Sequence, residues 1–87
     1  MAIITSGQVT IGTAPTLVDG TSTSDFRLTI HNMNNNHNIY LGGSDVTIAN
    51  GLQLLKLETI QFQMSPSSEL YAVADKLNLK LGFLKQV

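Results

Sequence analysis

The stretch that decides the fold runs from Phe26 to Leu57 and reads FRLTIHNMNNNHNIYLGGSDVTIANGLQLLKL. At its start, Phe26, Leu28 and Ile30 alternate with polar residues, which is the period-2 pattern of a half-buried strand. Apolar residues return at 39–41, after a mostly polar segment that is rich in asparagine. We therefore expect a hairpin-like unit here, against which strands from the rest of the chain pack.

Short strand-like segments continue on both sides of this unit, with alternation at 8–11, 60–64 and 77–83 and without strict alternation at 16–18 and 70–74. Glycine, asparagine, aspartate and proline separate them, and no segment has a convincing helical pattern. Strands at roughly ten-residue spacing are typical of all-β domains. We predict an all-β fold, a small antiparallel β-sandwich or jelly-roll-like barrel of about seven or eight short strands.

The end of the central stretch changes phase. Leu52 and Leu54 share one face of an extended chain, whereas Leu55 and Leu57 lie on the other. A β-bulge or burial on both faces explains such a change. A helix is less favoured because so short a segment, directly after Gly51, makes a poor helix. We also expect a turn at Asn50-Gly51, a strong short-range turn signal.

The chain has 87 residues, which is enough for one domain and too few for two cores. We divide it into an N-terminal arm or edge strand, residues 1–7, and a single β domain, residues 8–87. The sequence has no cysteine and two histidines, so neither disulfides nor a complete set of zinc ligands is available to stabilise it. Association with its own copies or with a larger assembly is the remaining way to stabilise a domain with so small a core.

Charged residues make up only 13% of the chain, with five Lys and Arg against six Asp and Glu. They are scattered, so the basic patch that nucleic-acid binding requires is missing. The apolar runs are too short for a membrane span or a signal peptide. We expect no nucleic-acid or membrane partner and synthesis in the cytoplasm. The low charge indicates either an ordinary polar surface or one covered by other subunits, and composition leaves both open.

Candidate catalytic residues are few. His31 and His37 flank the asparagine-rich segment, and Asp25 is the only local carboxylate that could complete a metal site. One outward strand histidine and one loop histidine is the simpler interpretation. The sequence around Ser44 lacks the second glycine of a nucleophile elbow, and the carboxylates form no evident pair. We therefore predict no enzyme activity, no metal and no cofactor.

Two further features have a binding interpretation and a structural one. Tyr40 and Tyr71 could stack on a sugar, but tyrosines on separate strands more often pack in a core or an interface. Gly42-Gly43 could approach a phosphate, but without a following helix a break in the strand is the better interpretation.

Three segments resemble small virion proteins of tailed bacteriophages: 39–47 (IYLGGSDVT), 50–54 (NGLQL) and 70–73 (LYAV). Asn32, at the end of FRLTIHN, fits the asparagine that ends a strand in that pattern. The chain departs from the pattern at 55–59, where a glutamate is kept but the glycine of a Gly-Glu turn is missing. The asparagine-rich loop before residue 39 is also longer.

The resemblance implies a capsid decoration (cement) protein, a homotrimer on the outside of a phage head that stabilises contacts between capsomers. Its partner would be the major capsid protein, and it would be made in the host cytoplasm and located on the virion. Alternatives are a tail, neck or fibre accessory protein of the virion and, less favoured, a carbohydrate-binding module. The N-terminal arm could add to a neighbouring sheet and the loop could project outward. The expected interface residues are Ala2, Ile3, Ile4, Thr5, Asn35, Asn36, His37 and Tyr40.

Overall fold

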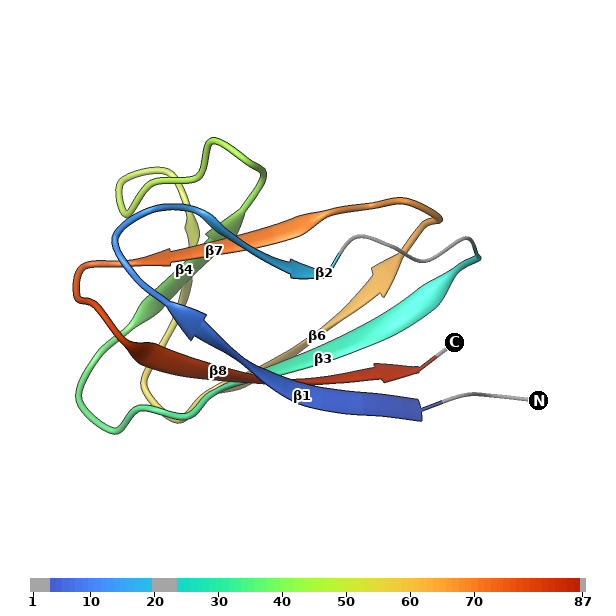
Figure 1. Ribbon diagram of the computed structural model, residues 1–87, viewed down its shortest axis with the longest axis horizontal. Coiled ribbons are helices and arrows are strands. Elements are labelled where there is room, and N and C mark those ends of the chain that lie inside the picture. Colours follow the sequence, from blue (N-terminus) through green and yellow to red (C-terminus); the bar gives the residue numbers. More distant parts are fainter. Residues whose placement is uncertain (1–3, 20–23, 87) are drawn as a thin grey trace.

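The computed structural model describes residues 4–19 and 24–86, which form two four-stranded antiparallel sheets packed as a sandwich (Figure 1). Sheet A has the order β1-β8-β3-β6, and sheet B has the order β2-β7-β4-β5. This eight-stranded, two-sheet arrangement is that of a jelly roll and confirms the predicted fold class. The strands are β1 (Ile4–Ile11), β2 (Thr16–Asp19), β3 (Phe26–Asn32), β4 (Ile39–Gly42), β5 (Leu52–Leu54), β6 (Thr59–Met64), β7 (Leu70–Ala74) and β8 (Leu79–Gln86).

The hairpin-like unit expected at the centre of the sequence is wrong. Strand β3 pairs with β6 and β8 in sheet A, whereas β4 pairs with β5 and β7 in sheet B. The asparagine-rich segment between them therefore carries the chain from one sheet to the other. A hairpin joins neighbouring strands through a tight turn, and residues 33–38 instead cross the end of the sandwich.

The core lies between the two sheets. The alternation at the start of β3 places Phe26, Leu28 and Ile30 inward, where at most 1% of each residue is exposed. Each such side chain contributes about 1.5–3 kcal/mol to folding through its removal from water. The other buried members of this cluster are Ile11, Val18, Ile39, Leu41, Leu54, Leu70, Ala72, Ala74, Leu79 and Leu81.

The phase change at 52–57 marks the end of a strand. Strand β5 stops at Leu54, and the backbone N–H of Glu58 donates to the carbonyl of Leu55 at 3.0 Å. Leu57 has a φ of 59°, in the left-handed region that turns use. Leu55 and Leu57 are both exposed. The expected bulge or two-sided burial is therefore wrong, because these leucines belong to a turn rather than to a strand.

The loop between β4 and β5 folds back over the outer face of sheet B. Val46, near its middle, is only 3% exposed although it lies outside the core between the sheets. Two glycines make room for it: a Cβ on Gly42 would lie 2.7 Å from Val46 Cγ2, and one on Gly51 would lie 3.0 Å from it. The predicted turn at Asn50-Gly51 is confirmed, with the Gly51 N–H donating to the Thr47 carbonyl at 2.9 Å.

Strand β1 forms one edge of sheet A and pairs with β8 from Ile4–Gln86 to Ile11–Leu79. Residues 4–7 are thus part of this edge strand. Whether residues 1–7 act as an arm toward another molecule stays a prediction.

Candidate functional site

The expected interface residues fall in separate regions of the molecule. Ile4 and Thr5 begin β1, beside the end of β8, whereas the segment after β3 lies at the opposite end of the strands. That segment holds Asn35 and Asn36, both exposed, and the half-buried His37, while Tyr40 lies half-buried on the outer face of sheet B. Ala2 and Ile3 lie outside the described residues. The structure does not gather these residues into one surface, and their role in an interface stays a prediction.

The most constrained polar group is the side chain of Asn32, which is fully buried at the end of β3. Its Nδ2 donates to the carbonyl oxygens of His37 at 2.9 Å and of Leu54 and Leu55 at 3.2 Å each. These bonds tie the end of β3 in sheet A to the end of β5 in sheet B. Buried side-chain amides of this kind are satisfied within the protein because an unpaired one is costly.

Two more asparagines extend this network. Asn32 Oδ1 accepts from the backbone N–H of Asn34 at 3.0 Å and from its Nδ2 at 2.9 Å, and the same Nδ2 lies 3.0 Å from the carbonyl of Lys80. Asn38 Oδ1 accepts from the N–H of Lys56 at 3.1 Å. We name Asn32, Asn34 and Asn38 the asparagine clasp. The sequence indicates only a mostly polar, asparagine-rich segment here, and nothing local to Asn32 indicates that its side chain bonds the end of β5 in the other sheet.

The two histidines do not form a metal site with other side chains. His31 Nδ1 lies 2.8 Å from Thr59 Oγ1, and His37 takes part in the clasp through its carbonyl. Across residues 4–19 and 24–86, no three His, Cys, Asp or Glu side chains gather closely enough to hold a metal ion. The same ranges contain no helix long and apolar enough to cross a membrane.

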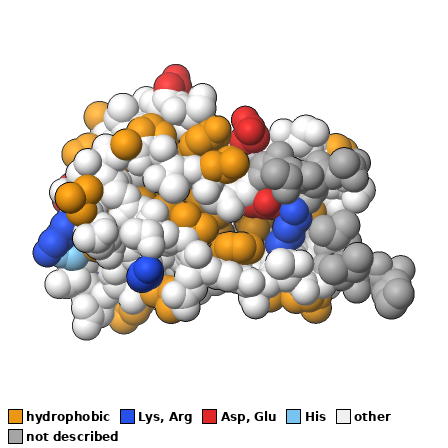
Figure 2. Space-filling model, in the orientation of Figure 1, with side chains coloured by type: hydrophobic (Ala, Val, Ile, Leu, Met, Phe, Trp, Pro, Cys, Tyr) orange, Lys and Arg blue, Asp and Glu red, His pale blue; other side chains and the backbone are white. Residues whose placement is uncertain are grey.

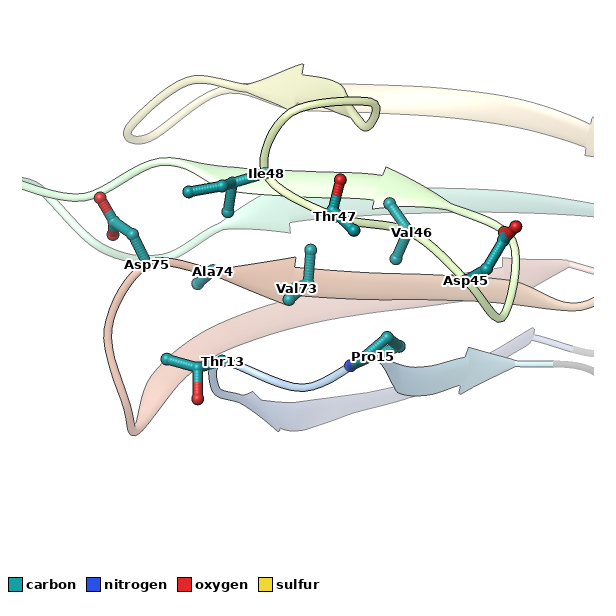
Figure 3. A pocket seen from close by; sticks show the side chains of 9 residues that line it. All are labelled: Thr13, Pro15, Asp45, Val46, Thr47, Ile48, Val73, Ala74 and Asp75. Carbon is teal, nitrogen blue, oxygen red and sulfur yellow. The ribbon is translucent and has the colours of Figure 1, made fainter.

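An open hollow of about 500 Å³ lies on the outer side of sheet B (Figure 3). Val73 of β7 forms its floor, Ala74 borders it at the end of the strand, and the β4–β5 loop and the β1–β2 turn form its sides. Asp45 and Asp75 stand at its two ends and, among the residues that the structure describes, are the charged ones that line it. The remaining lining residues are Thr13, Pro15, Val46, Thr47 and Ile48.

The outer face of sheet A carries cationic side chains rather than carboxylates. Because side chains alternate along a strand, the residues that do not point into the core form this face. Within the four strands its charged members are Arg27 and Lys80, and neither is accompanied by a carboxylate; Asp25, the nearest in sequence, precedes β3. Most others are hydroxyl or amide side chains: Ser6, Gln8, Thr10, Thr29, Thr59, Gln61, Gln63 and Gln86.

One side of the sandwich, where β1 and β2 are the edge strands, shows many hydrophobic side chains (Figure 2). An ion pair joins the sheets here: Lys85 Nζ of β8 lies 3.1 Å from Asp19 Oδ2 of β2. The same ammonium lies 4.9 Å from the centre of the Phe26 ring, within range of a cation–π interaction.

No protein-family model and no curated protein matches the sequence. A solved structure does match the fold. It is described as that of Bacillus endospore appendages, which form a novel family of disulfide-linked pili, and it is similar to this chain with a TM-score of 0.71. The match covers 99% of this chain and 83% of that one, with 8% identical residues.

This finding corrects the phage interpretation. The structure that matches almost the whole chain is a pilus protein, so the resemblance to a phage virion protein and the role of capsid decoration protein are wrong. The expected major capsid protein partner, the homotrimer on a capsid and the location on the virion are wrong for the same reason. The phage motifs describe turns and core positions, which unrelated jelly rolls share. The alternative role, a tail, neck or fibre accessory protein, is nearer to a pilus protein than the role of capsid decoration protein is.

Proposed function

We propose that this chain is a structural subunit that assembles with its own copies into a pilus-like surface fibre. The observation that carries the proposal is the match of 99% of the chain to the pilus-forming endospore appendages of Bacillus. That match accords with a structural role rather than an enzymatic one. We place the fibre on the spore surface, by analogy with those appendages.

The surface of the molecule supports self-association. Each sheet ends in two edge strands, β1 and β6 in sheet A and β2 and β5 in sheet B, and edge strands offer unpaired backbone groups to another chain. Large apolar side chains are exposed around these edges and in the loops: Ile4, Ile48, Leu52, Leu55, Leu57 and Leu77 are each at least 47% exposed. A low content of charged residues favours burial of such a surface between subunits.

The fibre that we propose is held together without disulfide bonds between copies of these 87 residues. The similar appendages are disulfide-linked pili, whereas these 87 residues contain no cysteine. We propose that the contacts consist of apolar burial, hydrogen bonds and ion pairs. Such a fibre keeps its length in a reductant and dissociates in guanidinium, which weakens apolar burial.

The test is assembly of the purified chain, followed by light scattering and by negative-stain electron microscopy, with and without dithiothreitol. We expect fibres of uniform width in both conditions and their loss in guanidinium. Immunogold labelling of spores then tests the location. A protein that stays monomeric at high concentration, in low and high salt, contradicts the proposal.

A further inference from the structure

The two outer faces of the sandwich differ in the sign of their charge. The hollow on sheet B is lined by Asp45 and Asp75 and by no cation, and the strands of sheet A present Arg27 and Lys80 outward with no carboxylate. All four side chains belong to exposed residues. These four side chains put opposite signs on the two outer faces, and each face has an opposite charge nearby in sequence: Lys76 follows Asp75, and Asp25 lies two residues before Arg27.

We propose that copies of this chain stack face to back, with the outer face of sheet A of one copy seated on the hollow of sheet B of the next. This inference rests on the proposed fibre and names the surfaces that build it. The occupant of the hollow is a second copy, because the outer face of sheet A supplies the cations that complement its two carboxylates.

The two surfaces also offer apolar side chains to each other. The hollow has an apolar floor and wall, including Val73 and the 51% exposed Ile48. The face of sheet A carries Leu84, which is 43% exposed, among uncharged hydroxyl and amide side chains. Lysine and arginine bury their aliphatic stems on apolar surface while the charged ends reach a carboxylate. A cationic side chain of one copy therefore suits a hollow with aspartates at both ends.

The geometry of such a contact leads to a fibre. The two surfaces are different and lie on opposite sides of the same sandwich, so the contact is heterologous. Each added copy presents a free hollow or a free sheet A face to the next one. A heterologous contact that does not close into a ring grows into an open filament. Stacking of this kind leaves the edge strands unpaired, which separates it from assembly by strand addition.

Charge reversal on each face tests the inference. One variant combines Asp45→Lys with Asp75→Lys, and the other combines Arg27→Glu with Lys80→Glu. Each variant alone has two faces of the same sign, and we expect its rate of fibre growth to fall at least about tenfold. An equimolar mixture restores complementary contacts in both directions, so we expect alternating fibres that grow within about twofold of the wild-type rate.

Matched control variants distinguish the effect of the proposed contact on fibre growth from the effect of a changed net charge. Lys56→Glu with Lys76→Glu, and Asp25→Lys with Glu69→Lys, change the net charge by the same amounts but leave the sign of both faces as it is. We expect each control pair to form fibres alone, and circular dichroism to show that all variants are folded. Normal fibres from both face variants, or equal failure of the controls, overturn the stacking alone. A wild-type chain that never forms fibres overturns the stacking together with the proposed function.

Discussion

In the part of the chain that the structure describes, side chains join the two sheets in two places that use different chemistry. At the end of β3 the asparagine clasp is centred on a neutral amide that is fully buried and bonded to three carbonyl oxygens. At the edge formed by β1 and β2, Lys85 and Asp19 form an ion pair whose side chains remain 14% and 13% exposed. One junction is neutral and dry, and the other is charged and reaches water.

The difference shows what each environment tolerates. A neutral amide loses little when it leaves water, provided that all its hydrogen bonds are made, so it can lie deep between the sheets. Two charges lose more on burial, and their attraction repays this only in part. The clasp should therefore be the stronger junction, since its removal leaves buried carbonyl groups without donors.

The largest effect is expected for Asn32→Asp, which keeps the shape of the side chain but turns an oxygen toward three carbonyl oxygens. We expect a loss of about 4 kcal/mol in unfolding free energy at pH 7. Burial and the carbonyls raise the pKa of the introduced carboxyl above its ordinary value of about 3.9. The loss is therefore smallest below that pH and grows as the pH rises through the folded-state pKa.

Guanidinium unfolding of Asn32→Asp and the wild type at pH 3 and pH 7 measures this difference. An equal loss at both pH values would show that the clasp does not discriminate against charge.

The next effect is expected for Asn34→Ala, which removes the bonds to Asn32 Oδ1 and to the carbonyl of Lys80. We predict a loss of about 2 kcal/mol in thermal or chemical unfolding. Asn35→Ala is the matched control, because Asn35 is exposed in the same segment, and it should change stability by less than about 0.5 kcal/mol. Similar losses in the two variants would mean that loop composition, rather than the clasp, matters.

The ion pair should contribute less. Lys85→Met keeps an aliphatic side chain beside Phe26 but removes the charge, and we expect a loss of about 1–2 kcal/mol at low salt. Salt should reduce this loss, because ions screen a pair that reaches water. A double-mutant cycle with Asp19→Asn isolates the coupling, and unfolding at two salt concentrations measures it. A coupling energy as large as the loss from Asn32→Asp would contradict the prediction that the clasp stabilises the fold more than the ion pair does.

The smallest effect is expected within a single sheet. Gln61 Nε2 donates to Thr29 Oγ1 at 3.0 Å on the exposed face of sheet A. Gln61→Ala should cost less than about 0.5 kcal/mol, because water replaces an exposed hydrogen bond. This value, measured by the same unfolding experiment, is the baseline against which both junctions are judged.

The alternation in β3 predicted the inward face correctly, because burial on one side of a sheet imposes a period of two on the sequence. It could not predict the neighbours of β3, since alternation specifies a face and not a partner. Asn32 and Asn35 are the same residue type in one segment, yet one is buried and the other exposed. Asn32 continues the inward phase of β3, whereas Asn35 lies beyond the strand, and two of the carbonyl acceptors of Asn32, on Leu54 and Leu55, are distant in sequence.

The hollow on the outer side of sheet B could not be predicted from the sequence either. The β4–β5 loop and Val73 of β7 line it together, and nothing local to Val46 or Val73 in the sequence indicates that they lie around one hollow. Low charge left contact between subunits open as one of two interpretations, and the role of the expected interface residues, from the arm, the loop and Tyr40, stays a prediction. The separation of charge between the two faces depends on strand order, which pairs Thr10 of β1 with Lys80 of β8.

The pairing of β1 with β8 has a consequence for biosynthesis. The first described strand finds its only neighbour in the last one, so sheet A stays incomplete until Leu79–Gln86 has left the ribosome. Topologies dominated by such distant pairings fold slowly, in milliseconds to seconds. For the fibre that we propose, a chain therefore has no complete sheet A to offer to another copy until β8 has paired with β1.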